Sequence, residues 1–582
     1  MEELAPNSPE LQMLINNKED GFKYRERRHE EWDETYLYYR SKVITNRLVQ
    51  RQSVTIPLMK QQVSTLMKDI DDMPVLYFEN LDNDDQAQLY KNEYWNYVVM
   101  DNNMEIQDIV DKKQVLLFGR SFDQWQIIDG KVKQTIIDVM DILVSRYTDP
   151  SDINSSRYLI HNHIFVPISV LEKNTDYDQQ EIKDLKTWYG TTMGLIKVST
   201  NQSMMVDKNQ KMRDLGLENM DNPVLGETYV ELSLHFVFRK EEKDEEEQIY
   251  LYVEAENRNI LMKKPLEDVI DPNRNCKDHF WRNHYPYESW ASDTERQDFW
   301  SDGAGDIVRP TNKILNAWAS QLVENRTLRN LGMQFYDSTV EGFNPGTFNP
   351  IAWGWYPYPG DPNKGIRKVD VPDLSESIDE MKFFIEISEK ATGATSGQQG
   401  APAQRQITLG EFNATLIEAK ERVKGMSKMY IPCWKRRGML FVKLVEANGG
   451  IIDSVKIEKK GRNTSKIYTK EISSADWETP NGYNCKVWTK DEKTAQDTNA
   501  LTKLDLAKSI MPMNKKLDEV YKRKVLSFAD LTPQETNDIM EEERQLMENP
   551  PIMAGAVEAG QVSGAPSMTG AVPKPKPNQI QA

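Results

Sequence analysis

The succession of helical patterns between residues 306 and 450 constrains the fold of this chain more than any other feature. Long amphipathic patterns occur three times, and the second and third are separated by the stretch GATSGQQGAPAQR at 393–405. That connector holds no large apolar residue, so it has nothing to contribute to a buried core. A fold that contains it must leave a polar, glycine-rich loop exposed between two stiff helices.

Boundary signals place the ends of these three helices. The first carries an apolar stripe to about residue 331, and Pro310 suits its first turn. The second begins near Asp373, with Glu376 as a capping partner, and stops at Gly393. The stripe residues are Ile314, Leu315, Trp318 and Leu322 in the first helix and Leu374, Ile378, Met381, Ile385 and Ser388 in the second. A capping box from Thr408 to Glu411 opens the third helix, and Pro432 predicts a kink in it.

The first 300 residues predict helices followed by antiparallel strands, so the fold class is α+β. We expect helices at 18–46, after Pro57 and at 84–118, where Gly119 stops the third. Beyond them, Asp129-Gly130 between two extended runs predicts a hairpin, and 147–152 a turn. Residues 229–255 alternate in polarity around the acidic run 241–248, which predicts two strands joined by a solvated tip.

Composition limits the classes of function. Lys and Arg number 73 against 91 Asp and Glu, a net charge of −18, which argues against a dedicated, tight nucleic-acid binder. Cys276, Cys433 and Cys485 lie far apart, so a disulfide framework or a cysteine zinc site is not expected. No run of 18 apolar residues and no signal peptide are present, so we expect no membrane partner and a protein assembled inside a cell.

Motifs that suggest catalysis are weak here. His161 and His163 stand in an alternating run, where they share one sheet face, and lack companion ligands for a metal. The stretch GATSGQQGA lacks the Lys of a phosphate-binding loop and follows a helix instead of a strand. We therefore expect no catalytic residue, no cofactor and no metal. The basic segment 420–437 spreads its charges around a helix, which favours a solvated or ion-paired face over a site for a passing polyanion.

The segment NPIAWGWYPYPGDPNKG at 349–365 concentrates aromatic residues where prolines and glycines resist a helix. The aromatic side chains are those of Trp353, Trp355, Tyr356 and Tyr358. They suit stacking on sugars or bases, but also packing against a neighbouring subunit or within a small local core. Subunit contact or local packing is the favoured interpretation.

The order of elements from 306 to 450 resembles the core of the portal proteins of tailed bacteriophages. DIVRPTNKILNAWASQLVENRTLRNLG at 306–332 resembles the first stem helix. DLSESIDEMKFFIEISEKATG at 373–393 resembles the second, including the ending that leads into the tunnel loop. ITLGEFNATLIEAKERVKGMSKMY at 407–430 resembles the long helix behind that loop. The likeness is strongest over 300–445, looser over 20–300 and weak after 490.

This resemblance implies a portal-like elongated protomer with an α/β wing, long stem helices, a small clip and a short helical crown. The implied parts are an N-terminal arm (1–17), the wing (18–300), the first stem helix (301–331), the clip (332–372), the second stem helix (373–392), the tunnel loop (393–405), a long kinked helix joining wing to crown (406–449), wing strands (450–490), crown helices (491–548) and a disordered tail (549–582). One departure is the crown, which is too short for a long C-terminal barrel.

The resemblance also implies the function. Twelve copies would form a ring at one capsid vertex, with a channel through which double-stranded viral DNA is packaged and ejected. The residues expected to face the DNA are Gly393, Gly397, Gln398, Gln399, Gly400, Gln404 and Arg405. The clip aromatics would dock the large terminase subunit and later a head-completion, adaptor or tail protein, while the wing would contact major capsid and scaffolding proteins. The protein would reside in the virion after assembly in the host cytoplasm, and would not be an enzyme.

Two alternatives stay open. One is a carbohydrate-active enzyme that uses the aromatics of 349–365 as a platform, which predicts a monomer or small oligomer. The other is a different ring-forming structural protein of the virion, such as a tail or baseplate component.

Overall fold

The structure is a computed structural model, and it describes the chain in separated stretches. These are residues 8–42, 54–70, 72–81, 85–192, 229–240, 246–293, 298–331, 334–336, 366–368, 374, 377–394, 409–449, 455–460, 465–470, 477 and 482–510, with a few residues between 518 and 540. The chain divides into two compact units, Met1–Glu458 with Ile467–Gln496, and Lys459–Lys466 with Asp497–Ala582. In the second unit, Lys508 and Lys522 both pair with Asp518, at 2.7 and 2.9 Å.

Helices make up much of the first unit. The longer ones are α1 (Pro9–Tyr39), α2 (Leu58–Asp69), α3 (Asp85–Asp101), α4 (Met104–Phe118), α6 (Gln179–Thr192), α9 (Ala304–Leu331), α11 (Ser377–Thr392) and α12 (Leu409–Ala447). Short helices are α5 (Ile168–Leu171), α8 (Leu266–Ile270), and the 3-10 turns η1 (Val139–Asp141), η2 (Ile153–Ser155) and η3 (Phe280–Arg282). The helix α14 (Lys490–Ile510) carries the chain from the first unit into the second. None of the described helices is long and apolar enough to cross a membrane.

Strands form several small antiparallel sheets, so the fold is a mixture of helix and sheet. The five-stranded sheet has the order β4 (Ile142–Val144), β5 (Tyr158–Pro167), β6 (Tyr229–Arg239), β7 (Gln248–Ala255), β8 (Asn259–Pro265). The three-stranded sheet has the order β3 (Lys131–Ile137), β2 (Arg120–Ile128), β9 (Tyr287–Ala291). Two-stranded sheets join β1 (Val75–Asn80) to β14 (Tyr483–Trp488), β10 (Gln334–Tyr336) to β11 (Ile366–Lys368), and β12 (Val455–Lys460) to β13 (Ser465–Lys470).

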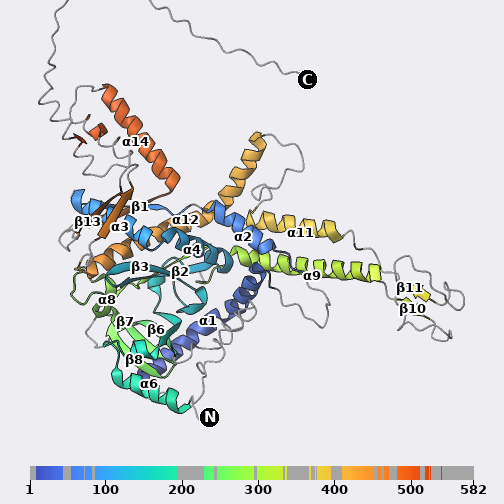
Figure 1. Ribbon diagram of the computed structural model, residues 1–582, viewed down its shortest axis with the longest axis horizontal. Coiled ribbons are helices and arrows are strands. Elements are labelled where there is room, and N and C mark those ends of the chain that lie inside the picture. The colour runs from blue at the N-terminus through green and yellow to red at the C-terminus, as the bar shows by residue number, and fades with distance from the viewer. Residues whose placement is uncertain are drawn as a thin grey trace, which may run out of the picture. The chain divides into compact units, whose positions relative to one another are not determined.

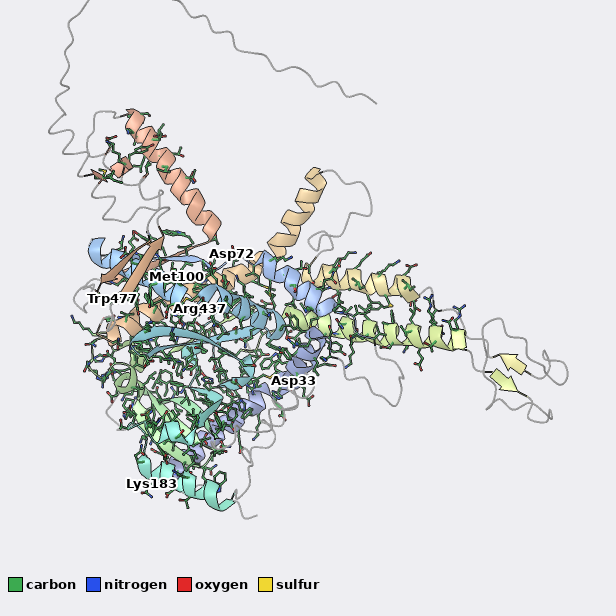
Figure 2. The ribbon with its side chains drawn as sticks, in the orientation of Figure 1. Asp33, Asp72, Met100, Lys183, Arg437 and Trp477 are labelled. Atoms are coloured by element: carbon green, nitrogen blue, oxygen red, sulfur yellow. The ribbon has the colours of Figure 1, made fainter. Side chains whose placement is uncertain are left out.

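Two large apolar cores hold the first unit together. One core combines the five-stranded sheet with α2, α4 and the beginning of α9 through residues such as Leu66, Leu116 and Leu315. The other is rich in aromatics and lies where α12 packs on α3 and on β1 and β2, with Trp95, Trp125 and Trp434 fully or almost fully buried. The side chains drawn in Figure 2 fill the space between the sheets and α12, and Arg437 lies among them.

Several predicted elements are confirmed. The β2–β3 hairpin turns at Asp129-Gly130, with φ angles of +52° and +74° that match a hairpin turn needing two left-handed residues. β6 and β7 pair as predicted, from Leu232 with Ala255 to Arg239 with Gln248. Of the acidic run 241–248, residues 241–245 lie outside the described part of the chain.

Other boundaries differ from the prediction, each for a local reason. The first helix starts at Pro9, inside the segment predicted as an arm, because the hydroxyl of Ser8 accepts from the Leu11 N–H and caps it. The helix predicted at 84–118 is two helices, since Asn103 takes a left-handed conformation between them. Helix α9 starts at Ala304, so Pro310 lies inside the helix and not in its first turn.

The strand that carries His161 and His163 does not alternate simply. His161 pairs with Leu234 and Ile164 with Leu232, so β5 has one extra residue at this point. His163 has a φ of +59°, which is the backbone signature of a bulge. The expectation that the two histidines share a face by plain alternation was wrong, because period-two reasoning fails across a bulge.

Helices α9 and α11 lie side by side and antiparallel, as Figure 1 shows. The ring of Trp318 in the middle of α9 meets that of Phe384 in α11 edge to face, at 5.2 Å between centroids. Beyond the end of α9, β10 pairs with β11, which returns the chain to α11. The long helix α12 contains Pro432, and its ribbon changes direction along its length (Figure 1).

Candidate functional site: the α9–α11 helix pair

Most of the residues predicted to act lie outside the described part of the chain. Of the tunnel-loop set, Gly397, Gln398, Gln399, Gly400, Gln404 and Arg405 are outside it, as are the clip aromatics Trp353, Trp355, Tyr356 and Tyr358. Gly393 is described, and it ends α11 as predicted. Its φ is +83°, and its N–H donates to the Glu389 carbonyl at 2.9 Å. The candidate site described below is therefore the pair of helices α9 and α11, which flank these segments in the chain.

One face of α9 binds the backbone of the segment before α2 and of the first turn of α2. The Asn312 and Asn316 side-chain carbonyls accept from the N–H groups of Met59 and Ile56, at 3.1 and 2.7 Å. The hydroxyl of Ser320 accepts from the Val54 N–H at 3.0 Å. The three side chains are spaced by four residues and lie on one face of α9. They form a row of acceptors for main-chain N–H groups that take part in no β-ladder.

The last turn of α11 is held by α2 at the same place. Gln62 is fully buried, and its Oε1 accepts from the hydroxyls of Ser388 and Thr392, at 3.1 and 3.3 Å. The predicted inward face of α11 is confirmed at Ser388, which is buried, whereas Ile378 is exposed. These hydrogen bonds fix the end of α11 that precedes residues 395–405 in the chain.

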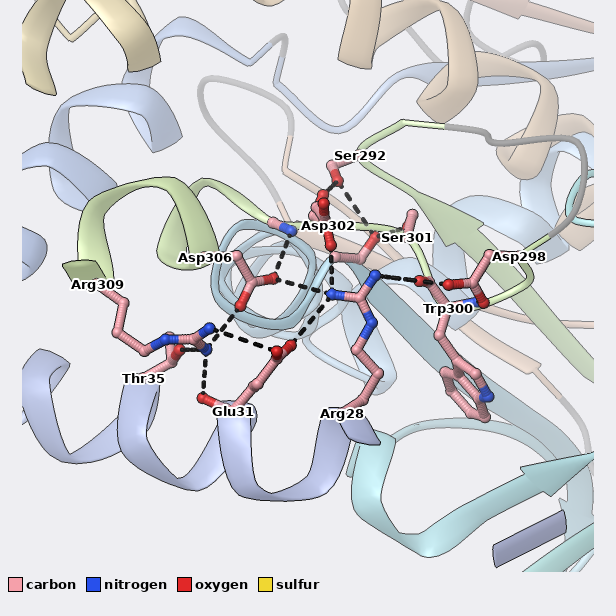
Figure 3. A network of polar contacts seen from close by, with 12 residues as sticks. Arg28, Glu31, Thr35, Ser292, Asp298, Trp300, Ser301, Asp302, Asp306 and Arg309 are labelled. Carbon is pink, nitrogen blue, oxygen red and sulfur yellow. Dashed lines mark hydrogen bonds and ion pairs between the residues drawn. The ribbon is translucent and has the colours of Figure 1, made fainter. Parts of the chain in front are cut away.

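A second set of contacts fixes the beginning of α9 to α1 (Figure 3). Arg309 of α9 donates to the Glu31 carbonyl at 2.8 Å and to the Thr35 hydroxyl at 3.1 Å. Arg28 of α1 donates to the Trp300 carbonyl at 3.0 Å and pairs with Asp302. The Asp306 carboxylate accepts from the Gly303 N–H at 3.0 Å and caps the first turn of α9.

Burial tunes the charges of this anchor. Burial raises the pKa of the Asp306 carboxyl, although the Gly303 N–H, Arg309 and Arg28 oppose that shift. For Arg28, burial is outweighed by its acidic neighbours, led by Asp302, and the pKa of the guanidinium is raised. Burial also raises the pKa of Tyr38 to about 12. Arg28 therefore stays charged beside Asp302, and it ties α1 to the residues just before α9.

Glycine makes the approach between α4 and the start of α9 possible. Gly119, which ends α4 as predicted, has a φ of +84°. A Cβ on Gly119 would lie 1.8 Å from the Ser301 carbonyl oxygen. The Gly119 carbonyl in turn accepts from the Ser301 hydroxyl at 2.7 Å. Only glycine fits at this position, so α9 begins in a closely packed, well-defined place.

Away from these anchors, the helix pair exposes large apolar side chains. Between 38% and 59% of the surface of each of these residues is accessible, and they are Ile307 and Ile314 on α9 and Ile378, Phe383 and Ile387 on α11. Phe383 and Ile387 lie on the side of α11 opposite to Met381 and Ile385, which pack toward the core. Exposed apolar groups thus recur along both helices of the pair.

Other candidate motifs have structural partners. His161 Nδ1 lies 3.0 Å from the Tyr287 hydroxyl, and His163 Nδ1 lies 2.7 Å from Asp141. Among the residues that the structure describes, no group of three or more His, Cys, Asp or Glu is placed to hold a metal ion. The three cysteines are buried, and burial raises the pKa of Cys433 to about 12, so that thiol is not an activated nucleophile.

The end of the basic segment 420–437 is ion-paired, as the favoured interpretation predicts. Arg437 is fully buried and donates to Asp111 and Asp123, at 2.9 and 3.0 Å. Arg436 donates to Glu288 at 2.8 Å. These two arginines serve packing inside the protein and are not available to a passing polyanion.

Sequence reasoning missed the acceptor row on α9. The spacing of Asn312, Asn316 and Ser320 is visible in the sequence, but nothing there names the segment 54–59 as its partner. It also missed Phe383 and Ile387, because they lie outside the single apolar stripe assigned to that helix.

Comparison with protein-family models and with curated proteins finds no match to this chain.

Proposed function

We propose that this chain is a portal protein of a tailed bacteriophage. In this proposal many copies, twelve by the resemblance, form a ring at one capsid vertex around a channel for double-stranded DNA. The α9–α11 pair is the stem, the chain between β10 and β11 belongs to the clip, and the residues after Gly393 form the tunnel loop. The protein hydrolyses nothing itself and serves as a docking platform for terminase, adaptor or tail proteins, capsid protein and scaffold.

The observation that carries the proposal is the helix pair with its exposed apolar residues. A lone protomer would leave Ile314, Phe383 and Ile387 in water, at a cost of about 25 cal/mol for each Å² of apolar surface. In a ring, each protomer covers the exposed helix faces of its neighbour, because a head-to-tail interface repeats until it closes. The two anchors at the base of the pair support this role, since a stem that lines a channel has to keep its direction.

The arrangement of connectors also supports it. Antiparallel helices put the chain between β10 and β11 at one end of the pair and the segment after Gly393 at the other. One end can then face docking partners while the other faces the channel. The polar and small residues of 393–405 suit DNA that must slide, because strong phosphate contacts would hold it.

The first test is the mass of the purified full chain, measured by mass photometry and compared with negative-stain images. We expect closed rings of about twelve copies with a central hole, as the resemblance implies. A stable monomer at micromolar concentration would refute the proposal. A ring located away from the capsid vertex would favour another structural protein of the virion.

The second test addresses the helix faces. Phe383→Ser combined with Ile387→Ser removes two exposed apolar groups from α11 and should leave the chain largely monomeric with unchanged circular dichroism. Val170→Ser is the matched control, because Val170 is equally exposed on α5 but lies outside the helix pair. Rings that survive the double change, or that the control also abolishes, would contradict the assignment of the interface.

The third test concerns the tunnel loop. Deletion of residues 396–404 leaves Gly393 and the buried Ala394 in place, so we expect rings of normal mass. We also expect genome packaging or retention to fail in phage that carry the deletion. If DNA handling is unchanged, the loop assignment is wrong even if the ring is right.

A further inference from the structure

The N-terminal half of α1 makes a small apolar contact with the five-stranded sheet. Leu11 and Leu14 are the buried apolar residues of this half, and Leu14 belongs to the apolar cluster between helix and sheet, with Met13 and Phe22 at its margin. The sheet supplies the rest of that cluster, including Ile160 and Tyr252. Because so few apolar groups are buried in this contact, its polar contacts decide whether this half of α1 stays docked.

A buried cluster of charges lies at the centre of the contact. Lys18 of α1 is 93% buried, and its Nζ donates to Ser233 Oγ on β6 and to Asn257 Oδ1, each at 2.8 Å. The same Nζ lies 3.5 Å from Glu254 Oε2 on β7. His235 Nε2 lies 3.2 Å from that same Oε2. One carboxylate oxygen therefore serves both the lysine and the histidine.

The geometry fits a neutral His235. Its Nε2–H donates to Glu254, while Nδ1 is buried, has no hydrogen-bond partner among the described residues and carries no proton. A second proton would have to sit on Nδ1, where none of the described residues offers an acceptor. It would also put a positive charge beside Lys18 in a site that excludes water, where like charges repel strongly.

The pKa values of the cluster point the same way. Burial lowers the pKa of His235, and Glu254 offsets only part of that effect. Burial raises the pKa of Glu254, but Lys18 and His235 outweigh it, and the net direction is down. Both groups thus hold the docked state together near neutral pH and lose that contribution in acid.

Other charged and titratable groups lie on this part of α1 and on the neighbouring strands and turns. They are Glu10, Asp20 and Arg25 on α1 itself, Asp141 and Arg146 beside β4, Tyr158 and His163 on β5, Glu231 and Arg239 on β6, Tyr252 on β7 and Lys263 on β8. Among them only His163 shares the chemistry of His235, and its Nδ1 is occupied by Asp141 at 2.7 Å. His163 therefore has to be tested separately.

We propose that acidification releases the N-terminal half of α1 from the five-stranded sheet, with protonation of His235 beside Lys18 and Glu254 as the trigger. The released segment is Pro9 to about Gly21, because the contacts of Arg25 and Arg28 lie beyond it. This inference does not depend on the proposed function. It makes α1 a pH-responsive strap between the sheet and the base of α9.

The direction follows from proton linkage. A histidine whose pKa is lower docked than released favours the released state once the pH falls below its ordinary value of about 6.5. Release therefore begins just below neutrality and is completed as the pH falls through the docked pKa. The carboxylates of Glu254 and Glu10 add to it only in stronger acid, because their pKa values are lowered too.

Hydrogen exchange of the full chain tests the proposal. Protection of the amides of residues 13–21 is compared at pH 7.5 and pH 5.5, after correction for intrinsic exchange rates. We expect protection to fall by up to about tenfold in this segment, the limit for one histidine with an ordinary pKa of about 6.5, and by less than about twofold in residues 430–445 of α12. Equal protection of residues 13–21 at both pH values would overturn the proposal.

Two variants separate the histidines. His235→Gln keeps a donor for Glu254 but does not titrate, so residues 13–21 should stay protected at pH 5.5. His163→Asn is the matched control, because Asn tolerates the positive φ at that position, and it should keep the full acid response. If His163→Asn abolishes the response and His235→Gln does not, the trigger is misassigned and the proposal falls.

One measurement needs no variant and covers the case in which His235→Gln does not fold. Raising the salt to about 0.5 M at pH 7.5 screens the exposed pairs of Glu10 and Asp20 but hardly affects the buried cluster. We expect protection of residues 13–21 to change by less than about twofold. Release by salt alone would show that surface ion pairs hold α1, which would contradict the proposal.

Discussion

Two helices of this protein pack on a sheet around buried charges, and the two contacts differ in what holds them. Where α1 meets the five-stranded sheet, one lysine faces one carboxylate, and α1 supplies a single fully buried residue to the apolar cluster. Where α12 meets the three-stranded sheet, Arg437 faces two carboxylates inside a large aromatic core. The α1 contact is held mainly by its charged groups, whereas the α12 contact is held mainly by its aromatic core, in which the charged groups are buried.

The donors around the carboxylates explain the second case. Asp111 also accepts from the Trp290 indole N–H at 2.9 Å, and Asp123 accepts from Trp125 and Gln134, at 2.6 and 2.8 Å. Even so, burial raises the pKa of Asp123 and raises that of Glu288 to about 7. Acid therefore relieves a cost at the α12 contact, while it removes support at the α1 contact. A contact with buried charges therefore depends on pH, and the surroundings of those charges decide whether acid strengthens or weakens it.

The largest expected effect comes from removing the central cation of each contact. Arg437→Met leaves Asp111 and Asp123 buried without their partner, and should lower the free energy of unfolding by about 3–5 kcal/mol. Lys18→Met should instead raise hydrogen exchange in residues 13–21 and leave the main thermal transition within a few degrees. Scanning calorimetry with hydrogen exchange measures both. If the main thermal transition shifts equally in the two variants, the two contacts do not differ as stated.

A smaller effect sharpens the sign of the pH dependence. Because the folded pKa of Glu288 is raised above its ordinary value, its contribution is present at low pH and is lost as the pH rises from about 4.5 through 7. Glu288→Gln removes that loss. Relative to the unmodified chain, the variant should gain roughly 2 kcal/mol between pH 5.5 and pH 8.5. Thermal unfolding at the two pH values measures this gain, and a gain in the opposite direction would contradict the assignment.

The smallest expected effect is at the margin of the α1 contact. Glu10 pairs with Arg239 and Lys263 at 2.6 and 3.0 Å, but all three side chains are about one-third exposed. Glu10→Gln should therefore cost no more than about 1 kcal/mol, and only at low salt. Hydrogen exchange of residues 13–21 at pH 7.5 tests it. A loss of protection as large as that of Lys18→Met would show that the exposed ion pairs of Glu10 keep α1 docked, and not the buried cluster.

Local signals in the sequence were enough for much of the fold. Asp129-Gly130 encodes its own turn, and Gly119 and Gly393 each end a helix through a left-handed conformation that L residues avoid. The start of α1 also has a local signal, since Ser8 before Pro9 is a capping residue, although we expected that helix to begin at residue 18. The break between α3 and α4 at Asn103 could not be predicted, because most asparagines within a helical pattern keep the helical conformation.

Features that depend on partners distant in the sequence could not be predicted. His235, Glu254 and Lys18 lie in three separate elements, and only the strand register and the position of α1 bring them together. The bulge at His163 is another case, since one extra residue in β5 cannot be seen without its partner strand. The described half of the candidate site, α9 with α11, was predicted as helices, but not its acceptor row or its second apolar face.

That acceptor row has a consequence for how the protein tolerates change. Because Asn312, Asn316 and Ser320 read only main-chain N–H groups, the identity of Val54 and Ile56 matters little to these bonds. A deep mutational scan should find the three α9 positions intolerant and Val54 permissive, except to proline, which has no N–H to give. Met59 lies in the apolar core and Ile56 packs against it, so these two partner positions should accept only apolar residues. Selection would then conserve the α9 side chains of this contact but not the residue type of the N–H donor, so the contact would produce no covariation between homologues.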